Sequence, residues 1–153
     1  MSIFSRKKTN RFFTNEESVH IVEAIRQAEL QTSGEVRVFV ESRCKFMDAL
    51  DRAAEIFYGL EMQKTEQRNA VLVYVAMKDR QLAVYGDEGI HQKVGDAYWQ
   101  AKVQKMISSF NRNDYADGIQ HCVLEVGNAL HQHFPYDKQV DKNELPDDIV
   151  FGR

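Results

Sequence analysis

Residues 70–76 read Ala-Val-Leu-Val-Tyr-Val-Ala, an unbroken apolar run that is rich in β-branched side chains. Such a run, with polar residues before and after it, is typical of a central strand that is covered on both faces. Residues 77–80 then turn the chain tightly, and residues 81–85 return as a second strand. A turn this short makes the second strand antiparallel to the first.

A further strand, at residues 36–40, and two amphipathic helices come before the apolar run in the chain. Val36, Val38 and Val40 alternate with other residues, which predicts a strand with one better-buried face. Between this strand and residues 70–76, Asp48 is a helix cap followed by apolar residues at helical spacing. The strand, helix and strand form a crossover, so we expect the two strands to be parallel.

Helices begin and end the predicted domain. Thr14 and Glu17 form a capping box, which predicts a helix over residues 15–30. A short helix over residues 90–94 follows the hairpin, and Asp96 and Asp114 are the expected caps of two long helices after it. Helices on both sides of a mixed sheet predict the α/β class, as a three-layer α/β/α sandwich.

The chain divides into a folded core and two charged ends. Residues 1–13 are a basic arm, residues 14–135 form the α/β domain, and residues 136–153 are an acidic tail. The apolar residues at 149–151 lead us to expect that the tail lies on the body of the domain. With 153 residues, 43% of them hydrophobic, the chain is long enough for one domain with a real core.

Charge and composition exclude several classes of partner. The net charge of −3 gives no attraction to nucleic acid or to an anionic membrane. The N-terminus lacks the apolar run of a signal peptide, and no stretch approaches the ~18 apolar residues that span a bilayer. The only cysteines, Cys44 and Cys122, have no metal-ligand spacing and suit a reducing compartment. We expect a cytoplasmic protein without membrane insertion.

Polar residues from three segments should meet at one edge of this sheet. The segments are the start of the first strand (residues 32–35), the start of the second (residues 66–69) and the end of the third (residues 86–89). They supply Ser33, Glu35, Glu66, Arg68, Asn69, Asp87 and Glu88, which we call the rim. Carboxylate, amide and carbonyl oxygens are the ligands that calcium prefers.

The rim has two interpretations. In the first, Glu35, Asn69, Asp87 and Glu88 bind calcium or another divalent cation. In the second, these are turn and cap residues on a solvated edge, where carboxylates before a helix are stabilised by its dipole. No catalytic residue is assigned, because no Ser or Cys occurs in a nucleophile motif.

Other metal-like patterns have simpler explanations. His131 and His133 lie near the end of a predicted helix, where cationic side chains are favoured by the dipole. Residues 111–122 are similar to a calcium-binding EF-hand loop, but the glycine is misplaced and Cys122 stands where the loop needs Glu. Trp99 and Phe110, at helical spacing, are expected in the core.

Several segments in this order resemble the TPM domain family. They are residues 32–41, 68–76 and 86–90, followed by Asp114, Tyr115 and Gly118. The chain resembles in particular the short bacterial members that have no signal peptide and no membrane anchor. The resemblance implies an α/β/α sandwich and, from some members, calcium binding. A plant branch is described as an acid phosphatase. Where many exported relatives have Asp-Asn-Gly, this chain has Arg68, Asn69 and Ala70.

Three functions therefore remain open. The first is a module that binds a divalent cation at the rim, with a regulatory role or an unknown protein partner. The second is a metal-assisted phosphatase in which Arg68 binds phosphate. The third is an interaction domain without a metal.

Overall fold

The computed structural model describes residues 12–136 and 148–152. The elements in chain order are α2 (Asn15–Leu30), β1 (Glu35–Glu41), α3 (Ala49–Gly59), β2 (Ala70–Ala76), β3 (Gln81–Gly86), α4 (Glu88–Val94), α5 (Asp96–Asn111), α6 (Tyr115–His133) and β4 (Ile149–Phe151). Most of the predicted basic arm and of the predicted acidic tail lies outside the described residues.

Helix ends follow local side-chain chemistry at most positions. The capping box is present, since the Glu17 amide donates to Thr14 Oγ1 at 3.0 Å and the Thr14 amide donates to Glu17 Oε1 at 2.8 Å. Asp48 caps α3 as predicted. The cap predicted at Asp96 is wrong by one residue, because Gly95 is the N-cap and Asp96 is the first residue of α5. Gly95 has a φ of 81°, which favours glycine and turns the chain between α4 and α5.

The four strands form one mixed sheet in the order β3-β2-β1-β4. As predicted, β1 and β2 are parallel, in a register that pairs Glu35 with Ala70, and β2 and β3 are antiparallel. The tail contributes more than the sequence indicated. Its apolar residues form β4, parallel to β1, with Ile149 opposite Val38.

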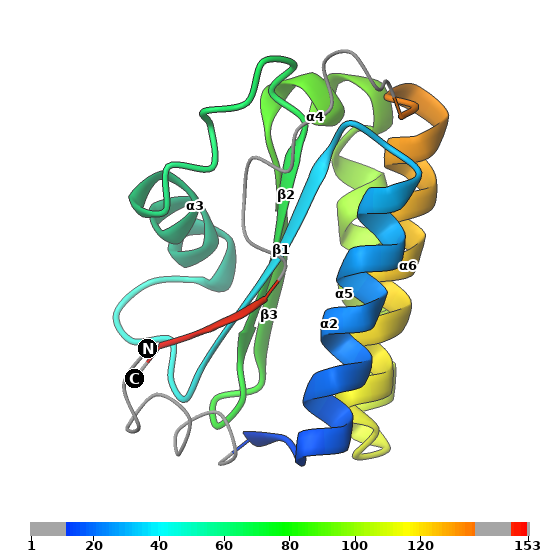
Figure 1. Cartoon of the computed structure of the whole chain (residues 1–153). Coiled ribbons are helices and arrows are strands. Elements are labelled where there is room, and N and C mark those ends of the chain that lie inside the picture. Colours follow the sequence, from blue (N-terminus) through cyan, green and yellow to red (C-terminus); the bar gives the residue numbers. More distant parts are fainter. Residues whose placement is uncertain (1–11, 137–147, 153) are drawn as a thin grey trace.

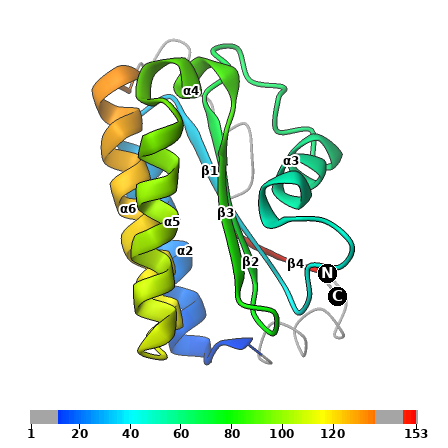
Figure 2. The ribbon, with the colours of Figure 1, turned by 180° about the vertical axis from the view of Figure 1, so that it is seen from behind.

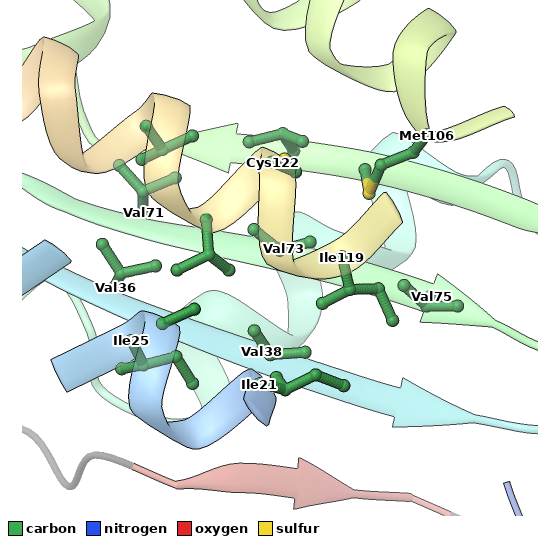
Figure 3. Packing of buried hydrophobic residues seen from close by; sticks show 14 of the residues in the cluster. Ile21, Ile25, Val36, Val38, Val71, Val73, Val75, Met106, Ile119 and Cys122 are labelled. Atoms are coloured by element: carbon green, nitrogen blue, oxygen red, sulfur yellow. The ribbon is translucent and has the colours of Figure 1, made fainter. Parts of the chain in front are cut away.

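The sheet lies between two helical layers, which confirms the three-layer α/β/α sandwich. Helices α2, α5 and α6 cover one face and α3 covers the other (Figures 1 and 2). Every residue of β2 is buried, because both of its faces are covered. Val71, Val73 and Val75 pack against the three-helix layer (Figure 3), while Leu72 and Tyr74 pack under α3.

Within residues 12–136 and 148–152, no helix is both long enough and apolar enough to cross a bilayer.

Candidate functional site

The three segments of the rim converge at one edge of the sheet, as the sequence predicted. The Glu35 amide donates to the Asn69 carbonyl at 3.4 Å, and the Asp87 amide donates to the Ala70 carbonyl at 2.9 Å. These bonds join the starts of β1 and β2 to the end of β3. The rim is therefore a continuation of the strand ladder rather than a set of independent loops.

Gly89 allows the chain before β2 to lie against the first turn of α4. A Cβ atom on Gly89 would lie 2.1 Å from the Gln67 carbonyl oxygen and 2.6 Å from that of Arg68. Without it, the Gly89 amide donates to the Arg68 carbonyl at 2.8 Å. Arg68 itself has a φ of 51°, a left-handed conformation that residues with a Cβ atom adopt at a cost. This backbone directs Arg68 toward Asp87 and Glu88.

Asp87 forms a two-pronged ion pair with Arg68. Arg68 Nε donates to Asp87 Oδ2 at 2.7 Å, and Arg68 Nη2 donates to Asp87 Oδ1 at 2.9 Å. Asp87 is 1% exposed and also caps α4, since the Glu88 amide donates to Oδ1 at 2.8 Å. Charge-assisted pairs with this fork geometry are among the stronger hydrogen bonds in proteins. The hydrogen bonds to Asp87 raise the pKa of Arg68, so the guanidinium stays charged.

Glu88 shares the same guanidinium. Arg68 Nη1 lies 3.3 Å from Glu88 Oε1, and the Glu88 side chain is exposed. One cationic group therefore contacts carboxylates from two successive residues. The guanidinium therefore lies between these two carboxylates.

Glu35 and Asn69 lie beside this cluster rather than in it. Glu35 pairs with Ala70 from one side and the Asp87 amide bonds to Ala70 from the other. The backbones of Glu35 and Asp87 are thus two strand spacings apart, roughly 10 Å. Asn69 Nδ2 donates to Ser33 Oγ at 3.2 Å. Within the described parts of the chain, no group of three or more His, Cys, Asp or Glu side chains is arranged to hold a metal ion.

The other residues considered as metal ligands or core residues, His131, Trp99 and the two cysteines, have the following contacts in the fold. His131 Nδ1 lies 2.8 Å from the Gln31 carbonyl oxygen, at the end of α6. Trp99 is 7% exposed, which confirms its predicted place in the core, and its Nε1 donates to His91 Nδ1 at 3.0 Å. Cys44 and Cys122 are free, and burial raises the pKa of Cys122 to about 12.

A second charged cluster lies at the opposite ends of the strands from the rim, and the sequence did not predict it. Glu41 is 4% exposed and accepts hydrogen bonds from Arg52 Nε and Nη2, both at 2.9 Å. The Tyr74 hydroxyl also donates to Glu41, and burial raises the pKa of Tyr74 above its ordinary value. The cluster ties α3 to β1 and β2. Glu41 ends its strand and therefore resembles a solvated residue in the sequence, so no pattern indicated its pairing with Arg52.

The architecture defines a class of α/β/α domain that is found in known proteins. A family model described as the TPM domain matches residues 7–129. The chain therefore belongs to the TPM domain family. A search of curated proteins finds no match.

Solved structures show the same fold. The BA42 protein of the psychrophilic bacterium Bizionia argentinensis is 39% identical, with a TM-score of 0.83 over 92% of this chain and 96% of that one. The N-terminal domain of the cg2496 protein of Corynebacterium glutamicum is 15% identical, with a TM-score of 0.62 over 77% of this chain and 74% of its own. An N-terminal domain from P. gingivalis is 17% identical, with a TM-score of 0.64 over 82% and 83%. The last two show likeness of fold alone.

Proposed function

We propose that this TPM domain binds a divalent cation, calcium, where Asp87 and Glu88 converge, and that Arg68 occupies this position when calcium is absent. One observation supports the proposal above others. A single guanidinium contacts both carboxylates, with distances of 2.7 Å to Asp87 and 3.3 Å to Glu88. Two carboxylates that face one cationic group form the start of a hard-cation site. Glu35 and Asn69 are the nearest predicted ligands that could complete it.

Competition with Arg68 sets the strength of binding. Calcium must displace the guanidinium from the same oxygen atoms, so we expect a Kd on the order of 10⁻⁴–10⁻³ M. Displacement frees the charge of Arg68, which also lines a groove beside β3. Calcium would therefore change the charge of a neighbouring surface, which is a regulatory or partner-binding role rather than a catalytic one.

Calcium titration of the chain, followed by amide NMR, tests this proposal. We expect shifts near Glu35, Asn69, Asp87 and Glu88 and none near His131. Calcium is bound by oxygen ligands, whereas the imidazole of histidine binds softer metals. The Arg68→Gln variant removes the competing cation. Since the competing ion pair is lost, its affinity for calcium should rise severalfold.

The matched control is Arg26→Gln, which removes the same charge from an exposed pair with Glu23 on α2. It should leave the calcium affinity unchanged. Asp87→Asn should abolish the shifts at the rim in either background. Shifts confined to the acidic residues 137–148, or an unchanged affinity in Arg68→Gln, would show that the rim is not the cation site.

A further inference from the structure

We propose that β3, the last strand on one side of the described sheet, binds an extended partner peptide as an additional strand, and that this peptide is apolar with a Lys or Arg at one end. The peptide would bind in the groove beside β3, which we call the β3 groove. The backbone of β3 and the helices that flank it form this groove, so binding there does not depend on calcium.

The backbone of β3 has one unpaired side among the described strands. In the sheet order β3-β2-β1-β4, β3 pairs with β2 alone. The Asp87 amide bonds to the Ala70 carbonyl, and alternate residues of an antiparallel strand face the same way. Residues 81, 83 and 85 therefore direct their amides toward β2. Leu82, Val84 and Gly86 direct theirs away from β2, toward the groove between α3 and α5. Leu82 and Val84 are only 8% and 2% exposed, so an added strand would have to part the side chains that cover these amides.

Two helices form the walls of the β3 groove. The groove has a volume of about 630 Å³ and is lined by Leu50 and Tyr58 of α3 and by Trp99 and Val103 of α5. Figure 2 shows β3 with α5 on one side of the sheet and α3 on the other. Leu50 and Tyr58 are 53% and 46% exposed, although both are large and apolar in character. A strand inserted beside β3 would bury side chains of both walls.

The same walls disfavour a second copy of this chain as the occupant. Both α3 and α5 lie over β3 itself rather than over the centre of the sheet. Paired strands are about 4.8 Å apart, whereas packed helix axes need about 8–10 Å. If two copies paired through β3, their α5 helices, or their α3 helices, would lie closer together than the ~8–10 Å that packed helices need. An extended peptide without helices of its own avoids the conflict.

The lining of the β3 groove indicates the chemistry of the peptide. Side chains of a strand alternate between two faces, and here each face meets an apolar wall, so apolar residues are required on both. At the end near α4, Glu88 and Asp96 are 63% and 84% exposed. Arg68, whose guanidinium lines this end, is shared by Asp87 and Glu88, so Asp96 adds a third carboxylate to one cationic group. A Lys or Arg at that end of the peptide complements the surplus of carboxylates.

Hydrogen exchange with synthetic peptides tests the inference. The probes are Ac-Val-Leu-Val-Tyr-Val-Lys-NH2 and its reversed sequence, which cover both strand directions, in buffer with EDTA so that calcium plays no part. At a peptide concentration of about ten times the Kd, exchange of the amides of Leu82, Val84 and Gly86 should slow about tenfold. The amides of Ala83 and Tyr85 should not change, because they already bond to β2. Only strand pairing predicts this alternation.

Two matched controls make the test specific. A peptide N-methylated at alternate residues keeps its side chains but loses its hydrogen bonds to β3, and it should not protect these amides. Leu50→Glu should weaken binding about fivefold or more, because it places a charge in the apolar wall. Leu30→Glu makes the same change at an exposed leucine of α2, away from the β3 groove, and should bind the peptide as the unaltered chain does.

Three results would overturn the inference. These are protection without the period of two, equal binding of the N-methylated peptide, and concentration-dependent dimerisation that protects the same amides without peptide. The last would identify a second copy as the occupant. None of these results bears on calcium binding at the rim, which is measured without peptide.

Discussion

At the scale of single residues, the rim depends on a glycine and on a strained arginine. Gly89 has no Cβ atom, so α4 begins in contact with the carbonyls of residues 67 and 68. Arg68 accepts a left-handed φ of 51°, and its pair with Asp87 offsets this cost. Asp87 connects these two features, because it is buried, caps α4 and binds the guanidinium of Arg68.

Gly89→Ala should destabilise the domain by about 1–3 kcal/mol, because the new methyl group would overlap backbone oxygens that cannot move freely. Urea unfolding measures the change. Gly59→Ala is the matched control, since a Cβ atom there would have nothing within 4 Å. It lies in α3 and should leave stability unchanged or raise it by up to about 1 kcal/mol. Equal effects of the two substitutions would show that the contact at Gly89 is not tight.

At the scale of elements, α5 and α6 are joined by a charged cluster. Lys102 Nζ lies 2.6 Å from Glu125 Oε1, and Lys105 Nζ lies 3.0 Å from Glu125 Oε2. Burial alone would raise the pKa of Glu125, but the hydrogen bonds from Lys102 and Lys105 outweigh it and lower the pKa. Two helices that are consecutive in the chain are thus fixed in register by ionic as well as apolar contacts.

The lowered pKa of Glu125 predicts a dependence of stability on pH. A carboxyl group whose pKa is lower in the folded state stabilises the fold at neutral pH, and this contribution is lost as the pH falls through the folded-state pKa. We expect Glu125→Gln to be less stable than the unaltered chain at pH 7, by about 0.5–1 kcal/mol after allowance for solvent screening. In acid the difference should disappear.

Urea unfolding at several pH values, with Glu23→Gln as the control, measures this difference. Glu23 belongs to an exposed pair within α2 and does not join two helices. A constant difference between pH 7 and strongly acidic conditions would mean that Glu125 acts through packing and not through its charge.

At the scale of the whole molecule, the two ends of the strands carry different charged clusters. Arg68 is bound by Asp87 and Glu88 at the rim, and Arg52 is bound by Glu41 and Glu55 at the opposite end. In both clusters the arginine is already engaged by carboxylates. This bears on the alternative function, because a phosphatase would need Arg68 to receive phosphate.

We expect the chain to hydrolyse p-nitrophenyl phosphate at little more than the background rate, with or without calcium or magnesium. Phosphoryl transfer needs positive charge placed around the transferred oxygens. At the rim a phosphate would meet Asp87 and Glu88 and would have to displace them from Arg68. Metal-dependent hydrolysis that disappears in both Asp87→Ala and Arg68→Ala, with the fold retained, would support the phosphatase instead.

The sequence alone determined the elements and most of their pairing. The apolar run at residues 70–76 specified a buried strand, and the crossover and tight turn on either side of it specified the directions of its neighbours. Thr14 and Glu17 specified a helix start. These features are encoded by residues close in the chain, through side-chain period, cap chemistry and connection length.

Tertiary structure alone decided how side chains distant in the chain meet. The pairing of Arg68 with Asp87 depends on a left-handed backbone and on the space left by Gly89, neither of which has a periodic signal. The same holds for β4, since three apolar residues become a strand only where β1 offers an unpaired edge. The exact N-cap of α5 depended on the φ of Gly95. Directions and distances of this kind exist only once the layers have packed, so the contact of Arg68 with Asp87 and Glu88 could be known only from the folded chain.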